Sequence, residues 1–193
     1  DVLIIGGGLC GILCSYMLKN AGVDCILVEA DKVCRGITNG TTAKITVQHG
    51  LIYNEIIKKY GVEKAKLYYK SQKMAFDTLT KLASEADNDL EFCDSFVYSL
   101  NDRSVIENEV EALNKIGCNA EFCEKTELPF KILGAVKSEN QAKFNPLKFA
   151  YRVAKELKIY ENTKVLELKS NKAITDSGTI KAEKIIVATH FPF

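Results

Sequence analysis

The chain has 193 residues, of which 47% are hydrophobic and 26% charged, values typical of a folded globular protein. Its 26 basic and 25 acidic side chains leave a formal net charge of +1, which argues against a nucleic-acid or anionic-membrane partner held by bulk charge. No apolar run approaches membrane-spanning length, and no signal peptide is visible, so we expect a cytoplasmic protein without a membrane span.

The ends of the chain and its cysteines add two expectations. Residue 1 is Asp and already belongs to an apolar strand, while Phe191–Phe193 follow directly on another strand, so we expect a piece of a longer protein. Seven cysteines without a Cys-x-x-Cys pair indicate reduced thiols that act as small apolar residues. Cys10 and Cys14 lie four apart on one face of a predicted helix, but the two histidines are distant in sequence, so we expect no metal site.

The first predicted elements form a strand–helix–strand unit, the crossover that a pair of parallel strands requires. Gly22 ends the first helix, and Gly61 caps the next one. A segment rich in Gly, Thr and Asn lies between the second strand and that helix. The predicted elements are strands at 1–5 and 25–28, a long loop or short helix at 31–50, and helices at 12–20, 53–60 and 62–86.

The pattern changes at about residue 92, after which short strands alternate with helices. Asn145 is a favourable N-cap and Pro146 a favourable first helical residue. The last apolar strand resembles the first two, which suggests a parallel sheet interrupted by an insertion and then rejoined. These elements are strands at 96–100, 119–123, 132–137, 165–168, 173–175 and 185–188, and helices at 103–116 and 146–157.

A glycine motif with complete context predicts a dinucleotide site. Gly6, Gly8 and Gly11 lie between a strand and a helix, and Glu29 ends the second strand 18 positions beyond Gly11. Gly6 permits the tight turn, Gly8 lets a pyrophosphate approach the backbone, and Gly11 lets helix and strand pack closely. The helix N-terminus then holds the anion, and the Glu29 carboxylate accepts hydrogen bonds from the ribose hydroxyls. That carboxylate also repels a 2′-phosphate, which argues against NADP.

The motif alone does not separate FAD from NAD, but the wider spacing favours FAD. FAD enzymes of the glutathione reductase-like type place Ala, Leu, Gly, Val and Glu at the positions that Ser15, Leu18, Gly22, Cys25 and Glu29 occupy here. Beyond Glu29, a Gly/Thr-rich loop at 36–44 and a late strand at 185–189 add to this pattern. With them, the chain resembles the front half of the D-amino acid oxidase (DAO) superfamily of FAD-dependent oxidoreductases. The stretches 41–53 and 140–148 look closest to the branch of gamma-glutamylputrescine oxidoreductase and Rieske-linked members.

The resemblance implies a fold and a domain plan. The fold class is α/β, a glutathione reductase-like FAD-binding Rossmann domain with an inserted α+β substrate domain whose sheet is incomplete. Residues 1–95 and 145–193 are expected to form the discontinuous FAD-binding domain, and residues 96–144 the first part of the substrate domain. Because the later half of such enzymes supplies most substrate contacts, no catalytic residue is named here, and the chain alone is expected to be a poor catalyst.

The resemblance also implies cofactor contacts. Gly6, Gly8 and Gly11 would bind the FAD pyrophosphate and Glu29 the adenosine ribose, with Ala30 beside the adenine. The further implied contacts are Thr38, Thr42, Ala43 and Lys44 along the ribityl and isoalloxazine path, Val165 at the adenine, and Ala188 and Thr189 on the other side of the cofactor. A solvated turn is the plain alternative for the Thr/Lys loop, and a salt-bridged surface residue that for Lys44.

Three functions fit these features to different degrees. The favoured one is oxidation of the C–N bond of a small-molecule amine or amino acid by hydride transfer to FAD, with a hydroxy acid or a glycerol 3-phosphate type substrate as the alternative. In some members an iron–sulfur domain beyond the end of this chain would take the electrons. A pyridine-nucleotide dehydrogenase is disfavoured, because the second strand is followed by a Thr-rich loop and long helices. A non-catalytic dinucleotide-binding module stays open, since fold does not decide function.

Overall fold

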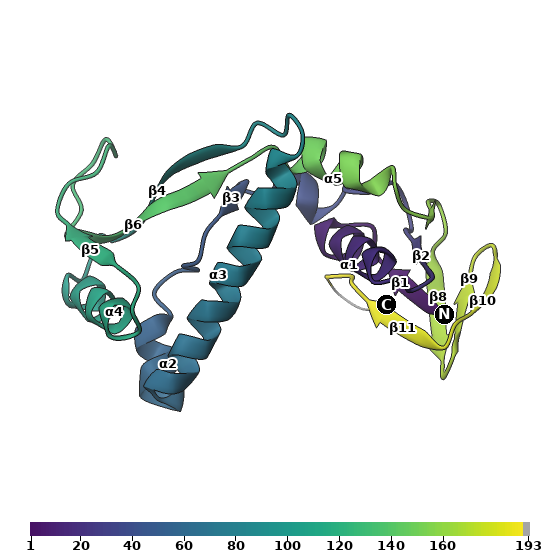
Figure 1. Cartoon of the computed structure of the whole chain (residues 1–193), viewed down its shortest axis with the longest axis horizontal. Coiled ribbons are helices and arrows are strands. Elements are labelled where there is room, and N and C mark those ends of the chain that lie inside the picture. The colour runs from purple at the N-terminus through teal and green to yellow at the C-terminus, as the bar shows by residue number, and fades with distance from the viewer. Residues whose placement is uncertain (191–193) are drawn as a thin grey trace. The chain divides into compact units, whose positions relative to one another are not determined.

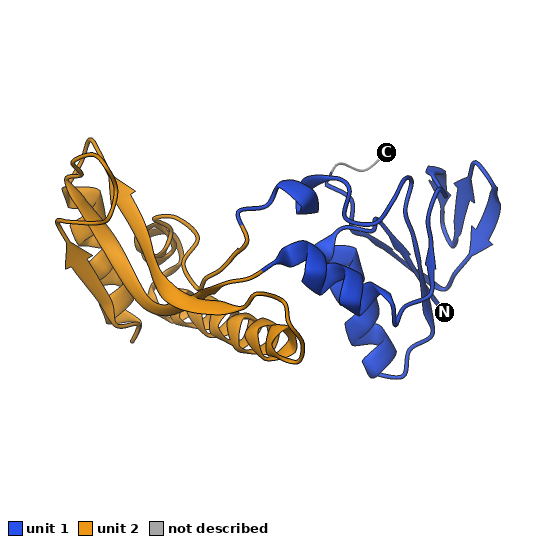
Figure 2. Ribbon diagram, turned by 90° about the horizontal axis from the view of Figure 1, so that it is seen from above, with its two compact units in different colours: residues 1–42, 145–193 blue, residues 43–144 orange. Residues whose placement is uncertain are grey.

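The structure, a computed structural model, describes residues 1–190, so the run Phe191–Phe193 lies outside the described part (Figure 1). The chain divides into two units. Unit 1 contains residues 1–42 and the residues from 145 onward, and unit 2 contains residues 43–144 (Figure 2). The units divide the chain at 42/43 and 144/145, and the limits of the expected domains lie at 95/96 and 144/145. Residues 43–95 therefore pack with residues 96–144, a grouping that their helical periodicity did not reveal.

Unit 1 is built on a parallel sheet with the strand order β11-β1-β2-β7. The central strands β1 and β2 are continuously apolar and almost fully buried, whereas β11 begins with Lys184 and is partly exposed. Helix α1 contacts β1 and β2, and α5 packs on α1. The late strand β11 pairs with β1, so the sheet is interrupted and rejoined as the sequence indicates. The elements are β1 (Val2–Ile5), α1 (Leu9–Asn20), β2 (Cys25–Val28), α5 (Pro146–Ala154), β7 (Ile159–Tyr160) and β11 (Lys184–Val187).

A three-stranded antiparallel meander accompanies this sheet. It consists of β8 (Val165–Lys169), β9 (Lys172–Thr175) and β10 (Gly178–Lys181). Val165 and Ala173 of the meander share a buried cluster with Leu3 and Ile5 of β1. The expected start of α5 is also present, because the Asn145 side chain accepts a hydrogen bond from the Lys148 backbone N–H at 3.1 Å. A short 3-10 helix, η1 (Ile37–Gly40), lies in the segment expected to be a long loop or a short helix.

Unit 2 combines an antiparallel sheet with three helices. Strand β6 pairs with β3, β4 and β5, and α4 packs on this sheet. Tyr53 and Ala65 from the first two helices share one buried cluster with Leu113 of α4 and Val136 of β6, which is why residues 43–95 belong to this unit. The elements are β3 (Lys44–Ile45), α2 (Tyr53–Tyr60), α3 (Val62–Ser84), β4 (Glu91–Ser99), α4 (Ser104–Lys115), β5 (Ala120–Cys123) and β6 (Gly134–Lys143).

Two strands of unit 2 are longer than their sequence pattern predicts. Strand β4 begins at Glu91 and not at 96, and β6 continues to Lys143 and not only to 137. The pairing of Phe92 with Ala142, beyond a register shift near Cys93, extends the ladder through polar residues that show no strand pattern. The two-residue strands β3 and β7 are also missed, because so short a stretch carries no periodicity.

Candidate cofactor site

Two glycines of the turn after β1, Gly6 and Gly11, have no room for a side chain. Gly6 has φ +112°, and a Cβ there would lie 2.9 Å from the carbonyl oxygen of Ala188. A Cβ on Gly11 would lie 1.9 Å from the carbonyl oxygen of Gly6, a distance at which atoms overlap. The first turn of α1 therefore rests directly on the backbone of the strand that precedes it, as the motif predicts.

Helix α1 begins at this turn, and the backbone N–H groups of its first turn can bind an anion. Gly8 is the N-cap residue, it forms no side-chain cap, and the first turn of α1 contains no acidic residue. The Leu9 backbone N–H donates to Oγ1 of Thr38 at 3.1 Å, so η1 is held against the helix start. Backbone N–H groups at a helix N-terminus attract negatively charged groups, which makes this turn a suitable phosphate cradle.

Glu29 stands directly after β2 and faces the same turn. Its Oε2 accepts a hydrogen bond from the Gly7 N–H at 2.6 Å, and its Oε1 accepts one from the Asp31 N–H at 3.0 Å. A carboxylate offers about four lone-pair positions. Two of them hold the loop in place, and the others are available for hydroxyl donors. The geometry thus lets one carboxylate shape the loop and bind a ribose.

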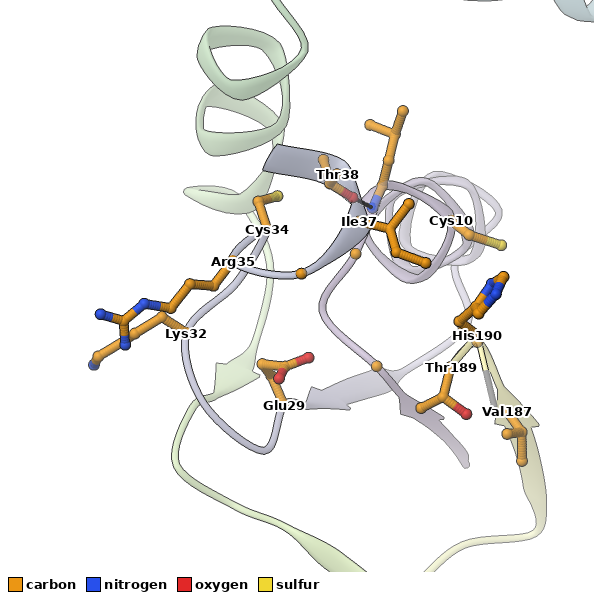
Figure 3. Close-up of a pocket in the computed structure, with 15 residues that line it drawn as sticks. Cys10, Glu29, Lys32, Cys34, Arg35, Ile37, Thr38, Val187, Thr189 and His190 are labelled. Atoms are coloured by element: carbon orange, nitrogen blue, oxygen red, sulfur yellow. Dashed lines mark hydrogen bonds between the residues drawn. The ribbon is translucent and has the colours of Figure 1, made fainter. Parts of the chain in front are cut away.

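An open cleft of about 620 Å³ lies at the carboxyl ends of β1, β2 and β11 (Figure 3). Six of the predicted site residues line it, namely Gly6, Gly8, Glu29, Thr38, Ala188 and Thr189. Gly11 lies behind the lining, where its small size permits the helix to approach β1. The remaining predicted residues are not in the lining. Ala30, Thr42 and Val165 belong to the same unit, and Ala43 and Lys44 belong to unit 2.

The cleft also contains residues that the sequence analysis did not select. They include Cys10, Lys32, Cys34, Arg35 and His190. Lys32 is ion-paired with Glu161 at 2.7 Å, and Arg35 with Asp31 at 3.0 Å. The available sequence signal was their position, because both cations follow Glu29 within six residues.

The lining contains two buried polar groups, the thiol of Cys34 and the hydroxyl of Thr189. Burial, with a smaller contribution from the nearby Glu29 carboxylate, raises the pKa of Cys34 to about 11, so this thiol stays protonated at neutral pH. The Oγ1 atom of Thr189 is buried and has no hydrogen-bond partner among the described residues. A buried hydroxyl without a partner costs free energy, and a ligand in the cleft offers such a partner after a rotation of the side chain. The residues present therefore fit a dinucleotide.

The parallel sheet, the glycine turn and the carboxylate after β2 together define a Rossmann-type dinucleotide-binding domain. The family described as FAD dependent oxidoreductase (DAO) matches residues 1–191, and the chain belongs to this family. The expected family, the expected fold class and FAD as the cofactor are thereby confirmed. Within residues 1–190, no three His, Cys, Asp or Glu side chains form a group that could hold a metal ion.

One relative and two solved structures illustrate this membership. YhfW of Bacillus subtilis (strain 168), named as a Rieske 2Fe-2S iron-sulfur protein, is 35% identical over 206 residues, which cover 100% of this chain and 40% of that protein. The structure of L-proline dehydrogenase from P. horikoshii has a TM-score of 0.78 at 18% identity, over 98% of this chain and 52% of the other. Glycine oxidase from Geobacillus kaustophilus has a TM-score of 0.77 at 17% identity, over 98% of this chain and 55% of the other.

The likeness to the two solved structures is one of fold. The chain spans about half the length of those structures and 40% of the length of the Bacillus subtilis relative. No helix in the described part of the chain is long and apolar enough to cross a membrane.

Proposed function

We propose that this chain is the cofactor-binding part of an FAD-dependent enzyme that oxidises the C–N bond of an amine or amino acid. The observation that carries the proposal is the glycine turn at the start of α1. There, backbone contacts exclude any side chain at Gly11, and an open cleft of about 620 Å³ adjoins Gly6 and Gly8. Such an arrangement lets helix and strand pack closely and leaves the helix N-terminus open to a pyrophosphate.

Each lining residue has a role in this proposal. The backbone at Gly6 and Gly8 and the N-terminus of α1 bind the pyrophosphate, and Glu29 accepts hydrogen bonds from the adenosine ribose. Thr38 steadies the helix start through its bond to Leu9. The Thr189 hydroxyl donates to the cofactor, which removes the cost of its buried, unpartnered state.

The remaining predicted contacts belong to the proposal as well. Ala30 and Val165 are proposed to lie at the adenine, and Thr42, Ala43 and Lys44 along the ribityl and isoalloxazine path. Gly11 acts indirectly, because its missing side chain lets α1 approach β1. Ala43 has φ +61°, a conformation that is uncommon for a residue with a side chain and is often found at functional turns.

The proposed substrate class draws on family membership and on the names of proteins with the same fold. Those names include a proline dehydrogenase and a glycine oxidase, both of which point to amino acids. When bound, FAD accepts the hydride from the substrate carbon, and the protein supplies binding, orientation and electrostatics. The name of the Bacillus subtilis relative supports an iron–sulfur domain as the electron acceptor in a longer polypeptide.

The visible absorption spectrum of the purified chain, with and without added FAD, tests the cofactor site. We expect flavin bands that stay with the protein through desalting. A substrate panel then follows on a polypeptide that also contains the region corresponding to the remainder of the relatives. We expect proline, glycine, other amino acids or amines to bleach the flavin under anaerobic conditions.

Three results would contradict the proposal in different ways. If both the chain and the longer polypeptide are colourless, the FAD site is wrong. If hydroxy acids or glycerol 3-phosphate bleach the flavin and amines do not, the substrate class is wrong. If the longer polypeptide keeps flavin that no compound of these classes bleaches, the chain is a non-catalytic binding module.

A further inference from the structure

Strand β4 lies at one edge of the unit 2 sheet. Strand β6 pairs with β4 along one side and with β3 and β5 along the other, so both sides of β6 are occupied (Figure 1). Within residues 1–190, no second strand pairs with β4. An edge strand presents backbone N–H and C=O groups that have no partner in the sheet and can pair with a further strand. This sheet can therefore be extended at β4.

The edge strands of the sheet differ in how well they are protected against such pairing. Strands β3 and β5 have two and four residues, and so short an edge offers little to a further strand. Strand β4 has nine residues and contains no Pro, Lys or Arg, residues that often block an edge. Its pairing with β6 is irregular between Cys93 and Ser95 and regular from Ser95 to Ser99. The regular part is the part that suits a further strand.

Exposed apolar side chains gather along this regular part. The Tyr98 ring contacts the Phe130 ring, with 5.8 Å between the centroids, and the Leu133 N–H donates to the Ser99 carbonyl oxygen at 2.9 Å. We define the β4 patch as the five side chains here that are between 41% and 51% exposed, namely Phe96, Tyr98, Leu100, Phe130 and Leu133. Neighbouring exposed apolar side chains of this kind mark a surface that contacts another protein segment.

The charged side chains of β4 already have partners within the sheet. Asp94 forms an ion pair with Lys137 of β6 at 3.2 Å, and Glu91 forms one with Lys143 at 3.1 Å. A segment that covers β4 therefore needs no basic side chains for these carboxylates. What β4 leaves open is backbone and apolar surface. A strand with apolar residues at every second position fits both, because alternate side chains of a strand lie on one face of the sheet.

We propose that the free edge of β4 and the β4 patch bind a β-strand from the part of a longer polypeptide that corresponds to the remainder of the relatives. This chain covers 52% and 55% of the two solved structures of the same fold and 40% of the Bacillus subtilis relative. A segment tethered to the same polypeptide has an effective concentration on the order of 1 mM, so it binds in preference to a second molecule at micromolar concentration. An incomplete sheet is expected from the sequence, but the edge and the side chains at which it continues come from the structure. This pairing goes beyond the proposed function, because it does not involve FAD.

Hydrogen exchange followed by mass spectrometry tests the pairing by comparing this chain with the longer polypeptide. Peptides that contain residues 95–99 should exchange about tenfold more slowly in the longer polypeptide, because a new strand protects the N–H groups that β6 leaves unpaired. Peptides from α4 serve as the internal reference. Their exchange should change less, since the N–H groups of this helix are paired within it in both polypeptides.

Two variants make the test specific for the β4 patch. Phe96→Ser removes an exposed ring in this chain, where we expect little change in exchange. In the longer polypeptide it removes a covered ring, and exchange of residues 95–99 should become about tenfold faster. The control is Leu67→Ser, at a residue of α3 that is 61% exposed and lies outside the patch. It should leave the exchange of residues 95–99 unchanged in both polypeptides.

Three outcomes overturn the inference. Equally fast exchange of residues 95–99 in both polypeptides means that no strand covers β4. Protection that rises with protein concentration, together with a dimer in light scattering, makes a second copy of the chain the occupant. Equal effects of Phe96→Ser and Leu67→Ser mean that the occupant does not contact the β4 patch. None of these readouts needs bound flavin, so this inference and the proposed function can fail separately.

Discussion

The two units of the chain are held in shape by different means. In unit 1 the decisive contacts are made by backbone, since a helix start rests on a strand at Gly6 and Gly11 and the adjoining cleft is open. In unit 2 a buried side chain makes the corresponding stabilising contacts. Glu109 of α4 is 0% exposed, and its two oxygens accept the N–H groups of Tyr53 and Asn54 at 2.9 Å each. At Gly11 any side chain would clash with backbone, whereas the contacts of Glu109 depend on the charge and the hydrogen bonds of its carboxylate.

The two units also differ in which side chains their sheets expose. Phe92, Phe96 and Tyr98 of the nine-residue strand β4 are 59%, 41% and 42% exposed, and the Tyr98 ring contacts Phe130. The two central strands of the unit 1 sheet, β1 and β2, are almost fully buried, as expected inside a parallel sheet. Unit 1 thus has an open cleft that can take a ligand, while unit 2 exposes aromatic side chains on its sheet. Three substitutions test these differences.

The largest effect is expected from Gly11→Ala in unit 1. The added Cβ would lie 1.9 Å from the Gly6 carbonyl oxygen, so the backbone of α1 or of the glycine turn would have to shift. We expect a loss of about 4 kcal/mol or more of unfolding free energy, together with loss of flavin binding. Urea unfolding and flavin absorption measure both.

The matched control is Gly40→Ala in η1, where an added Cβ meets no atom within 4 Å. It should change stability by less than about 0.5 kcal/mol. Equal effects of the two substitutions would show that the close approach of α1 and β1 is not what stabilises unit 1.

The next effect is expected from Glu109→Ala in unit 2. It leaves two N–H groups at the start of α2 without acceptors, and Ile52, the N-cap residue, supplies no side-chain acceptor of its own. A loss of about 3 kcal/mol is expected, because each unsatisfied buried donor costs about 1–3 kcal/mol. Hydrogen exchange should report the loss in residues 43–144 and leave unit 1 protected.

Glu111→Ala is the control, since this exposed residue of the same helix only pairs with Lys115. An exposed pair of this kind contributes less than about 1 kcal/mol. If both substitutions cost the same, the buried carboxylate is not the cap of α2.

The smallest effect is expected from Ser15→Ala, on the inner face of α1. The Ser15 hydroxyl is buried, has no hydrogen-bond partner within residues 1–190, and borders a cavity of about 110 Å³. Removing an unsatisfied hydroxyl should raise the unfolding free energy by about 1 kcal/mol. A decrease of similar size would mean that a bound water satisfies the hydroxyl. Ser71→Ala, at an exposed serine of α3 that bonds to the Tyr68 carbonyl, is the near-neutral control.

Local rules predicted the strand–helix–strand unit, the glycine turn and the start of α5. The contact between Gly11 and Gly6 follows from residues five apart, so the motif alone implies it. The Asn145–Pro146 start of α5 depends only on its own first turn. In contrast, the full length of β4 and β6 was missed, because Phe92 becomes a strand residue only through its distant partner Ala142.

The cleft also combines features that the local sequence predicts with features that depend on distant parts of the chain. Gly6, Gly8 and Glu29 were predicted from their spacing, whereas the buried Thr189 hydroxyl, which has no partner among the described residues, takes its place at the cleft only because β11 pairs with β1. By itself, the sequence determined the family, the glycine turn and the acidic end of β2, since steric exclusion and helix capping act over a few residues. Tertiary structure alone decided that residues 43–95 pack with unit 2. The apolar stripe of α3 shows that one face is buried, but burial of apolar surface is non-directional and names no partner.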